Sequence, residues 1–292
     1  MPNYKTHSIH AEKVLPYIDK RIYIDKEKLK VFSFGPDCLL FSDIKTFNNQ
    51  HDRDSKLFFD CLLRTIKTGR FQYNDEIMAF LYGQLEHFIL DSTFHPYIVY
   101  NTSLLKRNYI ADQHTTLELW LDDYFMNKYS VHDKAYYKNV LINDSTLKSI
   151  IDYVYIEVYK CYYASAKYNF GIGILSTLEN TRMNDTVIPE ISYRLGISDI
   201  RYNIINRIKP YLNTNRETWY HPYNLDEHHE SINDVWNKSV ALYLEVIEEV
   251  NAYLYDGKEL RSDILNQNLS YDTGLPSTNE KKLILTNKVA QN

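Results

Sequence analysis

The chain has 292 residues, of which 44% are hydrophobic and 24% are charged, and its formal net charge is −5 at pH 7. This composition is ordinary for a globular protein with a sizeable core, and the negative charge argues against a surface that binds duplex DNA. The sequence shows no apolar run long enough to span a membrane and no secretory signal in its first residues, so we expect a cytoplasmic protein.

Residues that interrupt helices are scarce, with eight glycines and eight prolines in the whole chain. Long helices are more compatible with so few turn signals than many short strands are, so the sequence predicts an all-α fold. The three cysteines, Cys38, Cys61 and Cys161, are odd in number and show no CxxC spacing. They predict no disulfide framework and favour a reducing, intracellular location.

Hydrophobic spacing predicts four helices in the first half of the chain, over residues 7–19, 56–68, 74–95 and 111–127. The first helix has Thr6 as its expected N-cap, and Pro96 is expected to end or kink the third. Between the first two helices, the Gly-Pro pair at 35–36 predicts a turn. Residues 48–54 read as a polar loop that carries His51.

The second half is predicted to form further helices over residues 145–170, 189–210 and 231–255. From Gln267 the chain is polar and is punctuated by Gly274 and Pro276, which predicts a loosely packed tail. Because we find no internal repeat and no flexible linker, we expect a single multi-helix domain over residues 1–265 and a polar C-terminal tail over residues 266–292.

The most informative stretch lies between residues 83 and 122, where histidines and carboxylates recur at steps of four. One predicted helix carries His87, Asp91 and His95, and the next carries His114 and Glu118. Residues four apart lie on one face of a helix, so three ligand-type side chains would project from one helix and two from the other. Imidazoles and carboxylates are typical ligands of Zn²⁺. Each pair alone would be an ordinary helix-surface pair, and their occurrence together predicts a metal site.

Several stretches extend this pattern along the chain. They are THSIHAEKVL, GPD, a histidine before the helix that contains FF, GQLEHFILDSTFHPYI and HTTLELWLD, followed by a later piece with WYHPYN and HHESINDVWNKSVALYLEVIEEVNAYL. Together they resemble the zinc-dependent phospholipase C family of bacteria, which has an all-helical fold and a cluster of three zinc ions. The resemblance spans roughly residues 4–275, and the spacing of His, Asp and Glu is its specific part.

The resemblance implies a ligand set for each ion. Asp37, His51, His87 and Asp91 would hold one zinc ion, and His95, His114 and Glu118 would hold a second. His7 would hold a third together with Asp91, which would then bridge two ions. In the family a processed N-terminal tryptophan completes the third site, and this sequence has no tryptophan near its start. Either water or another residue completes it here, with His10, one turn from His7, as a candidate, or the third site is weak or vacant.

Two or three closely spaced zinc ions suit the hydrolysis of phosphate esters, because they activate a water and hold the attacking and leaving oxygens. The candidate ligands exceed the four that one tetrahedral zinc needs, which favours more than one ion. Among the carboxylates, Asp37 follows a turn and is our predicted catalytic base. We therefore expect a phospholipase C-like phosphodiesterase whose substrate is a phospholipid or another small phosphodiester.

Three alternatives stay open at this point. A nuclease or phosphomonoesterase on the same fold would use a very similar zinc cluster, although the family pattern of a glutamate at position 118 favours the phospholipases. A non-catalytic, metal-stabilised helical module would bind a partner with an incomplete cluster. A metal-dependent HD phosphohydrolase would use His51 and Asp52, but it would leave the histidines of residues 83–122 unexplained. Asp52 is better explained as a loop charge or as a partner that orients His51.

Overall fold

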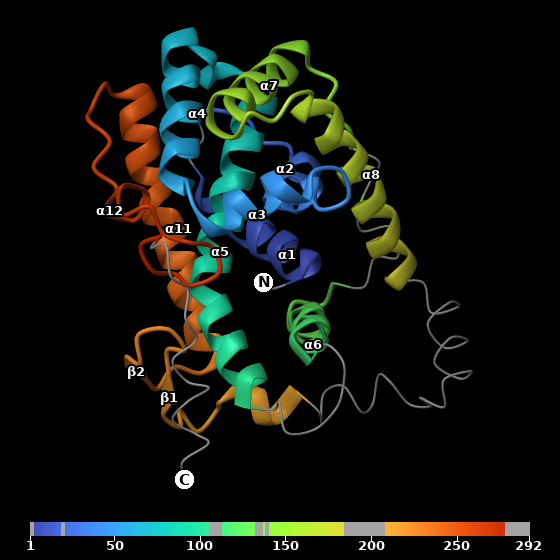
Figure 1. Ribbon diagram of the computed structural model, residues 1–292, viewed down its shortest axis with the longest axis vertical. Helices are drawn as coiled ribbons and strands as arrows, with labels where there is room; N and C mark the ends of the chain where they lie inside the picture. The colour runs from blue at the N-terminus through green and yellow to red at the C-terminus, as the bar shows by residue number, and fades with distance from the viewer. Residues whose placement is uncertain are drawn as a thin grey trace.

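A helix of 30 residues, α5 (Asp75–Leu104), runs through the middle of the molecule, and the other helices pack around it (Figure 1). The structure is a computed structural model that describes residues 3–18, 21–104, 113–131, 137, 140–183 and 208–277. Nearly all regular structure in these residues is helical, which confirms the predicted all-α class. The two strands, β1 (Trp219–Tyr220) and β2 (Glu227–His228), form one short antiparallel pair in which Trp219 lies opposite His228.

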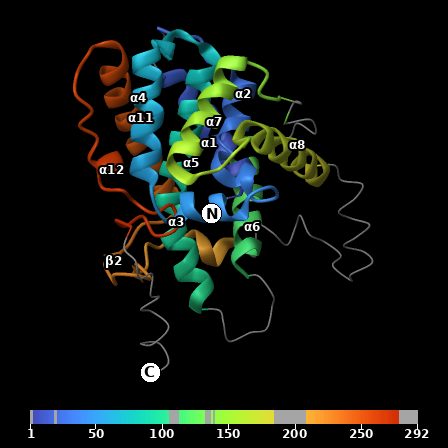
Figure 2. The ribbon, with the colours of Figure 1, turned by 45° about the horizontal axis from the view of Figure 1, so that its top comes forward.

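The helices around α5 come from the whole length of the chain. They are α1 (Tyr4–Val14), α2 (Lys26–Phe32), α3 (Ile44–Asp52), α4 (Ser55–Gly69), α6 (Gln113–Lys128), α7 (Ser145–Tyr159), α8 (Ala164–Met183), α11 (Ile232–Tyr255) and α12 (Asp263–Asn266). Short 3₁₀ helices connect some of them: η1 (Leu15–Tyr17), η2 (Gly35–Leu39), η3 (Phe71–Tyr73) and η4 (Lys209–Leu212). Figures 1 and 2 show α4 and α11 on one side of α5, and α1, α2 and α8 on the other.

Side-chain caps fix several helix starts, because each satisfies a backbone N–H that has no partner within the helix. Asp43 caps α3 and Asp144 caps α7, and Ser231 forms a capping box with Asp234 at the start of α11. The predicted helices over 56–68 and 231–255 are confirmed as α4 and α11, and the described part of 111–127 is confirmed as α6.

Two predictions for the first half of the chain are wrong. Thr6 does not cap α1, which begins at Tyr4 after an Asn3 cap. The N–H and the hydroxyl of Thr6 instead donate to Asp122 Oδ1, at 2.8 and 2.7 Å, and so tie α1 to α6. The stretch predicted as a polar loop is largely helical, since α3 continues to Asp52 and places His51 in its last turn.

The sequence predicts an end or a kink of the third helix at Pro96, and the predicted end is wrong, because α5 continues to Leu104. Proline lacks the N–H that would bond the carbonyl of Ser92, four residues earlier. That carbonyl faces Gly274, where a Cβ would lie only 2.3 Å from Ser92 O, and Gly274 also has a φ of +62°. Only glycine fits this approach and this backbone conformation. Tertiary packing against a buried helix outweighs the local preference of proline.

The helix predicted over 145–170 is two helices, α7 and α8. Lys160 and Tyr163 both have a φ of +56°, which breaks the helical path between them. The N–H of Cys161 reaches back to the carbonyl of Tyr155 at 3.1 Å and closes the end of α7. The helix predicted over 189–210 lies, up to residue 207, outside the described residues.

The C-terminal segment (residues 268–277) packs against the helices, so the expected loose packing is wrong for this stretch. Tyr271 is fully buried, and its N–H donates to the carbonyl of His51 at 3.0 Å. The hydroxyl of Ser277 donates to the carbonyl of Asp52 at 2.9 Å. Residues 278–292 of the predicted tail lie outside the described residues, and the division of the chain at residue 265 stays a prediction.

No helix in the described ranges is at once long enough and apolar enough to cross a bilayer. The three cysteines are buried and free, in agreement with the predicted lack of a disulfide framework. The cytoplasmic location stays a prediction.

Candidate metal centre

All eight residues predicted as metal ligands lie in three adjoining groups, although five separate elements contribute them. The elements are α1 with His7, η2 with Asp37, α3 with His51, α5 with His87, Asp91 and His95, and α6 with His114 and Glu118. The first group is Asp37, His51 and His87, toward which Asp91 also turns one oxygen; the second is His95, His114 and Glu118; and the third is His7, His87 and Asp91. In each group the ligand atoms lie within 4.8 Å of one another, and seven of the eight residues are buried.

The first group surrounds one point with nitrogen and oxygen atoms. His51 Nε2 lies 3.1 Å from Asp37 Oδ1 and 3.8 Å from Asp91 Oδ2. His87 Nε2 lies 3.7 Å from Asp37 Oδ1 and 3.2 Å from Asp91 Oδ2. All four atoms are buried, and none has a hydrogen-bond partner. Buried polar atoms are rarely left without a partner, so this set fits a shared cation.

Backbone carbonyls orient the histidine rings of the centre. Nδ1 of His51 lies 2.9 Å from the carbonyl of Phe47, and Nδ1 of His87 lies 3.0 Å from that of Ser33. A carbonyl only accepts, so Nδ1 of each neutral ring holds the proton and Nε2 presents its lone pair to the centre. This is the tautomer that a metal ligand needs.

A close approach of the backbone supports His87 as well. Gly35, in the GPD motif, has a φ of +56°, and a Cβ at this position would lie 2.2 Å from Cγ of His87. Only glycine allows both the conformation and the contact. The motif therefore places Asp37 and leaves room for the His87 ring at the same time.

The second group brings together ligand-type residues of α5 and α6. His95 Nε2 lies 3.1 Å from His114 Nε2, which lies 2.8 Å from Glu118 Oε1. His95 Nδ1 lies 2.6 Å from the carbonyl of Asp272 in the C-terminal segment. These residues border a cavity of about 250 Å³ that is also lined by Phe47, Asn48, His51, Asp52 and Thr115.

The third group contains His7, whose ring stacks on His87 with 4.3 Å between the ring centres. His7 Nε2 lies 3.1 Å from Asp91 Oδ1, while the other oxygen of Asp91 faces the first group. Asp91 thus lies between two groups, in the bridging position that the resemblance implies. His10 and Asp52, the two possible accessory residues, belong to none of the three groups.

The charged groups of the centre shift one another's pKa values. Burial alone would lower the pKa of His7, but Glu86 and Asp91 raise it to about 10. Burial would also lower the pKa of His51, but Asp37 raises it to about 9. Burial would raise the pKa of Asp91, but His87 and His7 hold it well below its usual value. For His95, burial dominates and lowers the pKa to about 4. The carboxylates therefore favour positive charge in the first and third groups.

Sequence reasoning missed two residues beside the centre, Glu86 and Asp272. Glu86 is fully buried and lies 3.2 Å from Nδ1 of His7. Its position next to His87 in the chain was visible, but it breaks the step of four, so spacing did not select it. Asp272 lies far along the chain from His95, and no local pattern links the two residues.

A sequence model of the family described as zinc dependent phospholipase C matches residues 5–169, which is more than half of the chain. The chain belongs to this family. The match to the zinc-dependent phospholipase C family covers all eight predicted ligands, from His7 to Glu118. No curated protein and no solved structure shows a significant match to the chain. Family membership confirms the resemblance read from the sequence, and it makes zinc the ion that the nitrogen and oxygen ligands imply.

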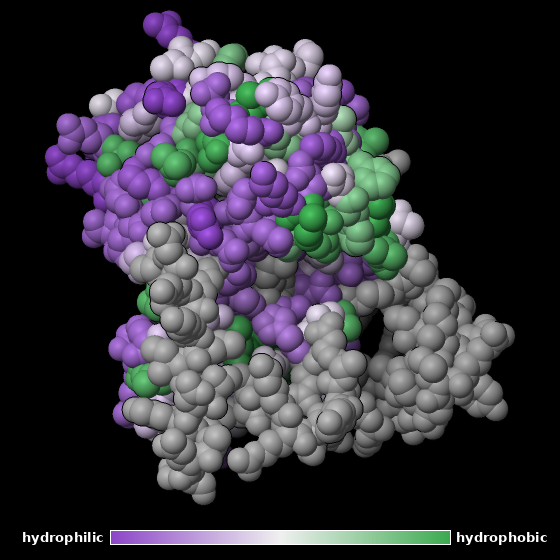
Figure 3. Space-filling view, in the orientation of Figure 1, coloured by the Kyte–Doolittle hydropathy of each residue, from purple (hydrophilic) through white to green (hydrophobic). Residues whose placement is uncertain are grey.

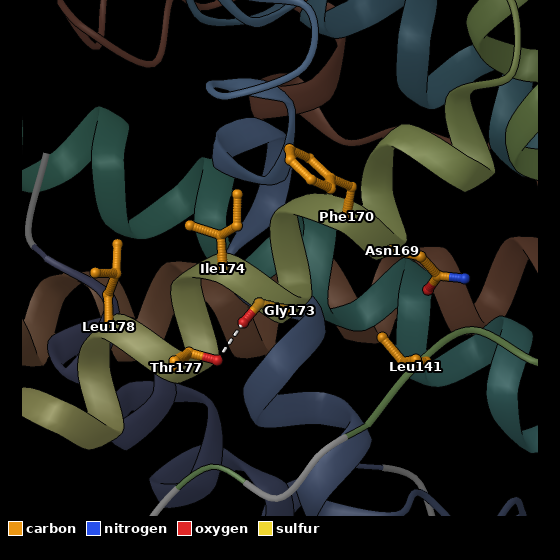
Figure 4. Close-up of a pocket in the computed structure, with 7 residues that line it drawn as sticks. All are labelled: Leu141, Asn169, Phe170, Gly173, Ile174, Thr177 and Leu178. Atoms are coloured by element: carbon orange, nitrogen blue, oxygen red, sulfur yellow. Dashed lines mark hydrogen bonds between the residues drawn. The ribbon is translucent and has the colours of Figure 1, made fainter.

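A second hollow, of about 490 Å³, lies on the outer side of α8 and is apolar. Phe170, Ile174 and Leu178 project from one side of the helix (Figure 4). Figure 3 shows an apolar patch where α8 lies in Figure 1, on a face whose described part is otherwise mostly hydrophilic. The described residues that line this hollow include no histidine, carboxylate or cysteine, and none of them belongs to the metal centre.

Proposed function

We propose that this protein is a zinc-dependent phosphoric ester hydrolase of the phospholipase C type. The observation that carries the proposal is the set of four buried atoms around one point that have no hydrogen-bond partner. Membership of the zinc-dependent phospholipase C family supports the choice of zinc. The three groups offer ligands for two or three ions.

Each of the three groups would hold one ion. Asp37, His51, His87 and Asp91 would hold the first ion, and His95, His114 and Glu118 would hold the second. His7 would hold the third with Oδ1 of Asp91, so that Asp91 would bridge the first and third ions. The distances between Nε2 atoms and carboxylate oxygens, from 2.8 to 3.8 Å, support this division.

Bound zinc would supply a water of lowered pKa and positive charge for the phosphate oxygens. Asp37 is the residue that we propose as the base, because its buried Oδ1 faces the first group, where it would bind the ion and leave the second carboxylate oxygen to accept a proton. The carbonyls of Phe47 and Ser33 would keep His51 and His87 in place while a proton moves to Asp37. The described residues that line the cavity include no lysine or arginine, so among these residues neutralisation of the phosphate would depend on the ions.

The cavity beside the second group supports a small phosphodiester as the substrate. Its volume of about 250 Å³ has room for a phosphate and a small substituent, so the acyl chains of a phospholipid would stay outside. With a phospholipid, attack by water at phosphorus would release diacylglycerol and a phosphorylated head group. The glutamate at position 118 favours lipid over nucleic acid within the fold, as the family pattern implies.

A metal assay combined with a substrate panel tests the proposal. The protein is purified with excess zinc, its zinc content is measured by mass spectrometry, and it is assayed on a chromogenic choline phosphodiester and on phospholipid micelles. We expect two or three zinc ions per chain and hydrolysis that a chelator abolishes. Less than one ion per chain would contradict the metal centre.

Two further outcomes of the same assay would reassign the function. Cleavage of single-stranded DNA without any action on phospholipid micelles would move the protein to the nucleases of this fold. A zinc-loaded protein that is inactive on every substrate would favour a metal-stabilised binding module.

A further inference from the structure

Behind the third group lies a buried carboxylate that belongs to none of the metal-ligand groups. Glu86, on α5, is fully buried and lies between two histidines of α1. Its Oε2 is 3.2 Å from His7 Nδ1, and its Oε1 is 3.0 Å from His10 Nδ1. Both histidine side chains are also completely buried. Bringing a carboxylate and two imidazoles out of water is unfavourable, so their arrangement calls for a specific explanation.

Hydrogen-bond directions fix how this set is connected. Ser239 Oγ donates to the carbonyl of Trp236 at 2.8 Å, so its single proton is taken. It lies 3.1 Å from His10 Nε2 and therefore accepts from that nitrogen. Glu86 in turn accepts from His7 Nδ1, which leaves His7 Nε2 directed at Asp91. Hydrogen bonds therefore join α11 to His10 and Glu86 to His7, whereas His10 Nδ1 and Glu86 Oε1 lie 3.0 Å apart without a hydrogen bond between them.

Aromatic residues of α11 pack against the ring of His10 and hold it in its position. The rings of Trp236 and His10 pack edge to face, with ring centres 5.0 Å apart and ring planes at 85°. Tyr243 lies on another side, 5.9 Å from the same ring. His10 therefore cannot swing round to complete the third group, which was its possible role in the sequence. It lies behind Glu86, on the side away from Asp91.

We propose that Glu86 is a positioning residue for the third zinc ion. This inference depends on the proposed zinc function. A carboxylate on the far nitrogen of a metal-bound histidine fixes the tautomer and the ring orientation and makes the ligand nitrogen more basic. Loss of such a partner typically weakens metal binding about 10–100-fold. Glu86 thereby gives the third site a rigid histidine, where water or another group completes the coordination.

The test compares the zinc affinity of variants at Glu86. Glu86→Leu removes the acceptor and should weaken the binding of one ion about 10–100-fold, with the other ions held as in the wild type. Glu86→Gln keeps an oxygen that accepts from His7 Nδ1, so it should lose clearly less than Glu86→Leu does. Affinity is measured by competition with a graded series of chelators, and zinc content is measured by mass spectrometry.

A matched control separates positioning from general destabilisation. Asn251 on α11 is also buried against α5, where it accepts from the hydroxyl of Tyr82 at 2.6 Å, and it touches no predicted ligand. Asn251→Leu should lower the melting temperature and leave every zinc affinity unchanged. In a double-mutant comparison, Glu86→Leu should add no further zinc loss once His7→Ala is present.

A measurement on the wild type covers the case in which Glu86→Leu does not fold. In the zinc-loaded protein, a long-range ¹H–¹⁵N spectrum of the histidines should show Nδ1 of His7 protonated and Nε2 bound to metal. Metal on Nδ1, or unchanged zinc affinity in a folded Glu86→Leu protein, would overturn the positioning role alone. A wild type that holds no zinc would overturn the proposed function as well.

Discussion

Four of the five histidines of the candidate centre turn Nε2 toward the other ligands while Nδ1 is engaged elsewhere. Carbonyls of Phe47, Ser33 and Asp272 engage three of the rings, and the carboxylate of Glu86 engages His7. These partners come from the interiors of α3 and α5, from the C-cap of α2 and from the C-terminal segment. At the scale of single residues, the centre is therefore defined as much by what lies behind the ligands as by the ligands themselves.

Replacement of Asp37 tests its role as base and ligand. We expect Asp37→Asn to reduce turnover of a choline phosphodiester about 10²–10⁴-fold, because an amide cannot accept the proton from the attacking water. The fold should persist, since the amide is nearly the same size. Asp52 lines the same cavity but belongs to no ligand group, so Asp52→Asn should keep its zinc and most of its activity. Equal losses in the two variants would contradict a specific role for Asp37.

Zinc binding should release protons at pH 7. In the metal-free protein the raised pKa values of His7, about 10, and His51, about 9, keep both rings protonated at this pH. A zinc ion must displace those protons, so its affinity should rise with pH between 6 and 9. Calorimetry of the metal-free protein in buffers of different ionisation enthalpy measures the protons released. A binding enthalpy that does not depend on the buffer would contradict the prediction.

At the scale of elements, the position of Asp37 depends on how closely α8 packs against η2. Gly171 of α8 touches the backbone of Cys38, the residue after Asp37, and a Cβ there would lie 1.8 Å from the Cys38 carbonyl oxygen. Figure 1 shows α8 crossing beside the N-terminal helices on this side of the molecule. The split of the predicted 145–170 helix is what allows α8 to take this direction.

Gly171 and Gly173, which are two residues apart in α8, give a matched test of this contact. Gly171→Ala should destabilise the protein by about 1–3 kcal/mol or more and should weaken zinc binding, since backbone must move to admit the new Cβ. At Gly173 a Cβ would meet nothing within 4 Å. Gly173→Ala should be neutral or stabilising by up to about 1 kcal/mol, because alanine favours a helix over glycine. Urea unfolding and zinc affinity of both variants measure these effects, and equal behaviour would refute them.

At the scale of the whole molecule, the two ends of the described chain meet at the metal centre. His7 lies in the first helix, and the C-terminal segment supplies the carbonyl that orients His95. Tyr271 from the same segment packs on the rings of His51 and His87, with ring centres 5.2 and 5.9 Å apart. The centre therefore forms only when most of the chain has folded.

Truncation of the chain tests this dependence. A protein that ends at Asn266 should lose about 3–5 kcal/mol of stability through the loss of buried Tyr271 alone, by analogy with large-to-small changes of aromatic residues. It should also bind the second ion more weakly, because His95 loses its partner. A protein that ends at Ser277 retains the described contacts and serves as the control. Thermal unfolding and zinc content are measured for both truncated proteins. Equal melting temperatures and equal zinc contents would contradict the prediction.

Local sequence patterns predicted several helices of the fold and several residues of the candidate site. The hydrophobic period predicted α4, α6 and α11, and the steps of four predicted that His87, Asp91 and His95 share one helix face and that His114 and Glu118 share another, since spacing along a helix fixes a face. The same logic failed where tertiary contacts decide. Pro96 is accommodated inside α5 by Gly274, and positive φ angles at Lys160 and Tyr163 divide a helix that periodicity alone would continue.

The sequence by itself determined the helical class and the family, because residue type and short-range spacing carry that information, and the resemblance to that family implied the eight candidate ligands and their division among the ions. Only the tertiary structure decided that these residues lie in adjoining groups and that Glu86 and the carbonyl of Asp272 hold the rings in place. It also showed that His10, a possible ligand in the sequence, belongs to no ligand group and lies 3.0 Å from the carboxylate of Glu86. These contacts join residues far apart in the chain, and no local period encodes them.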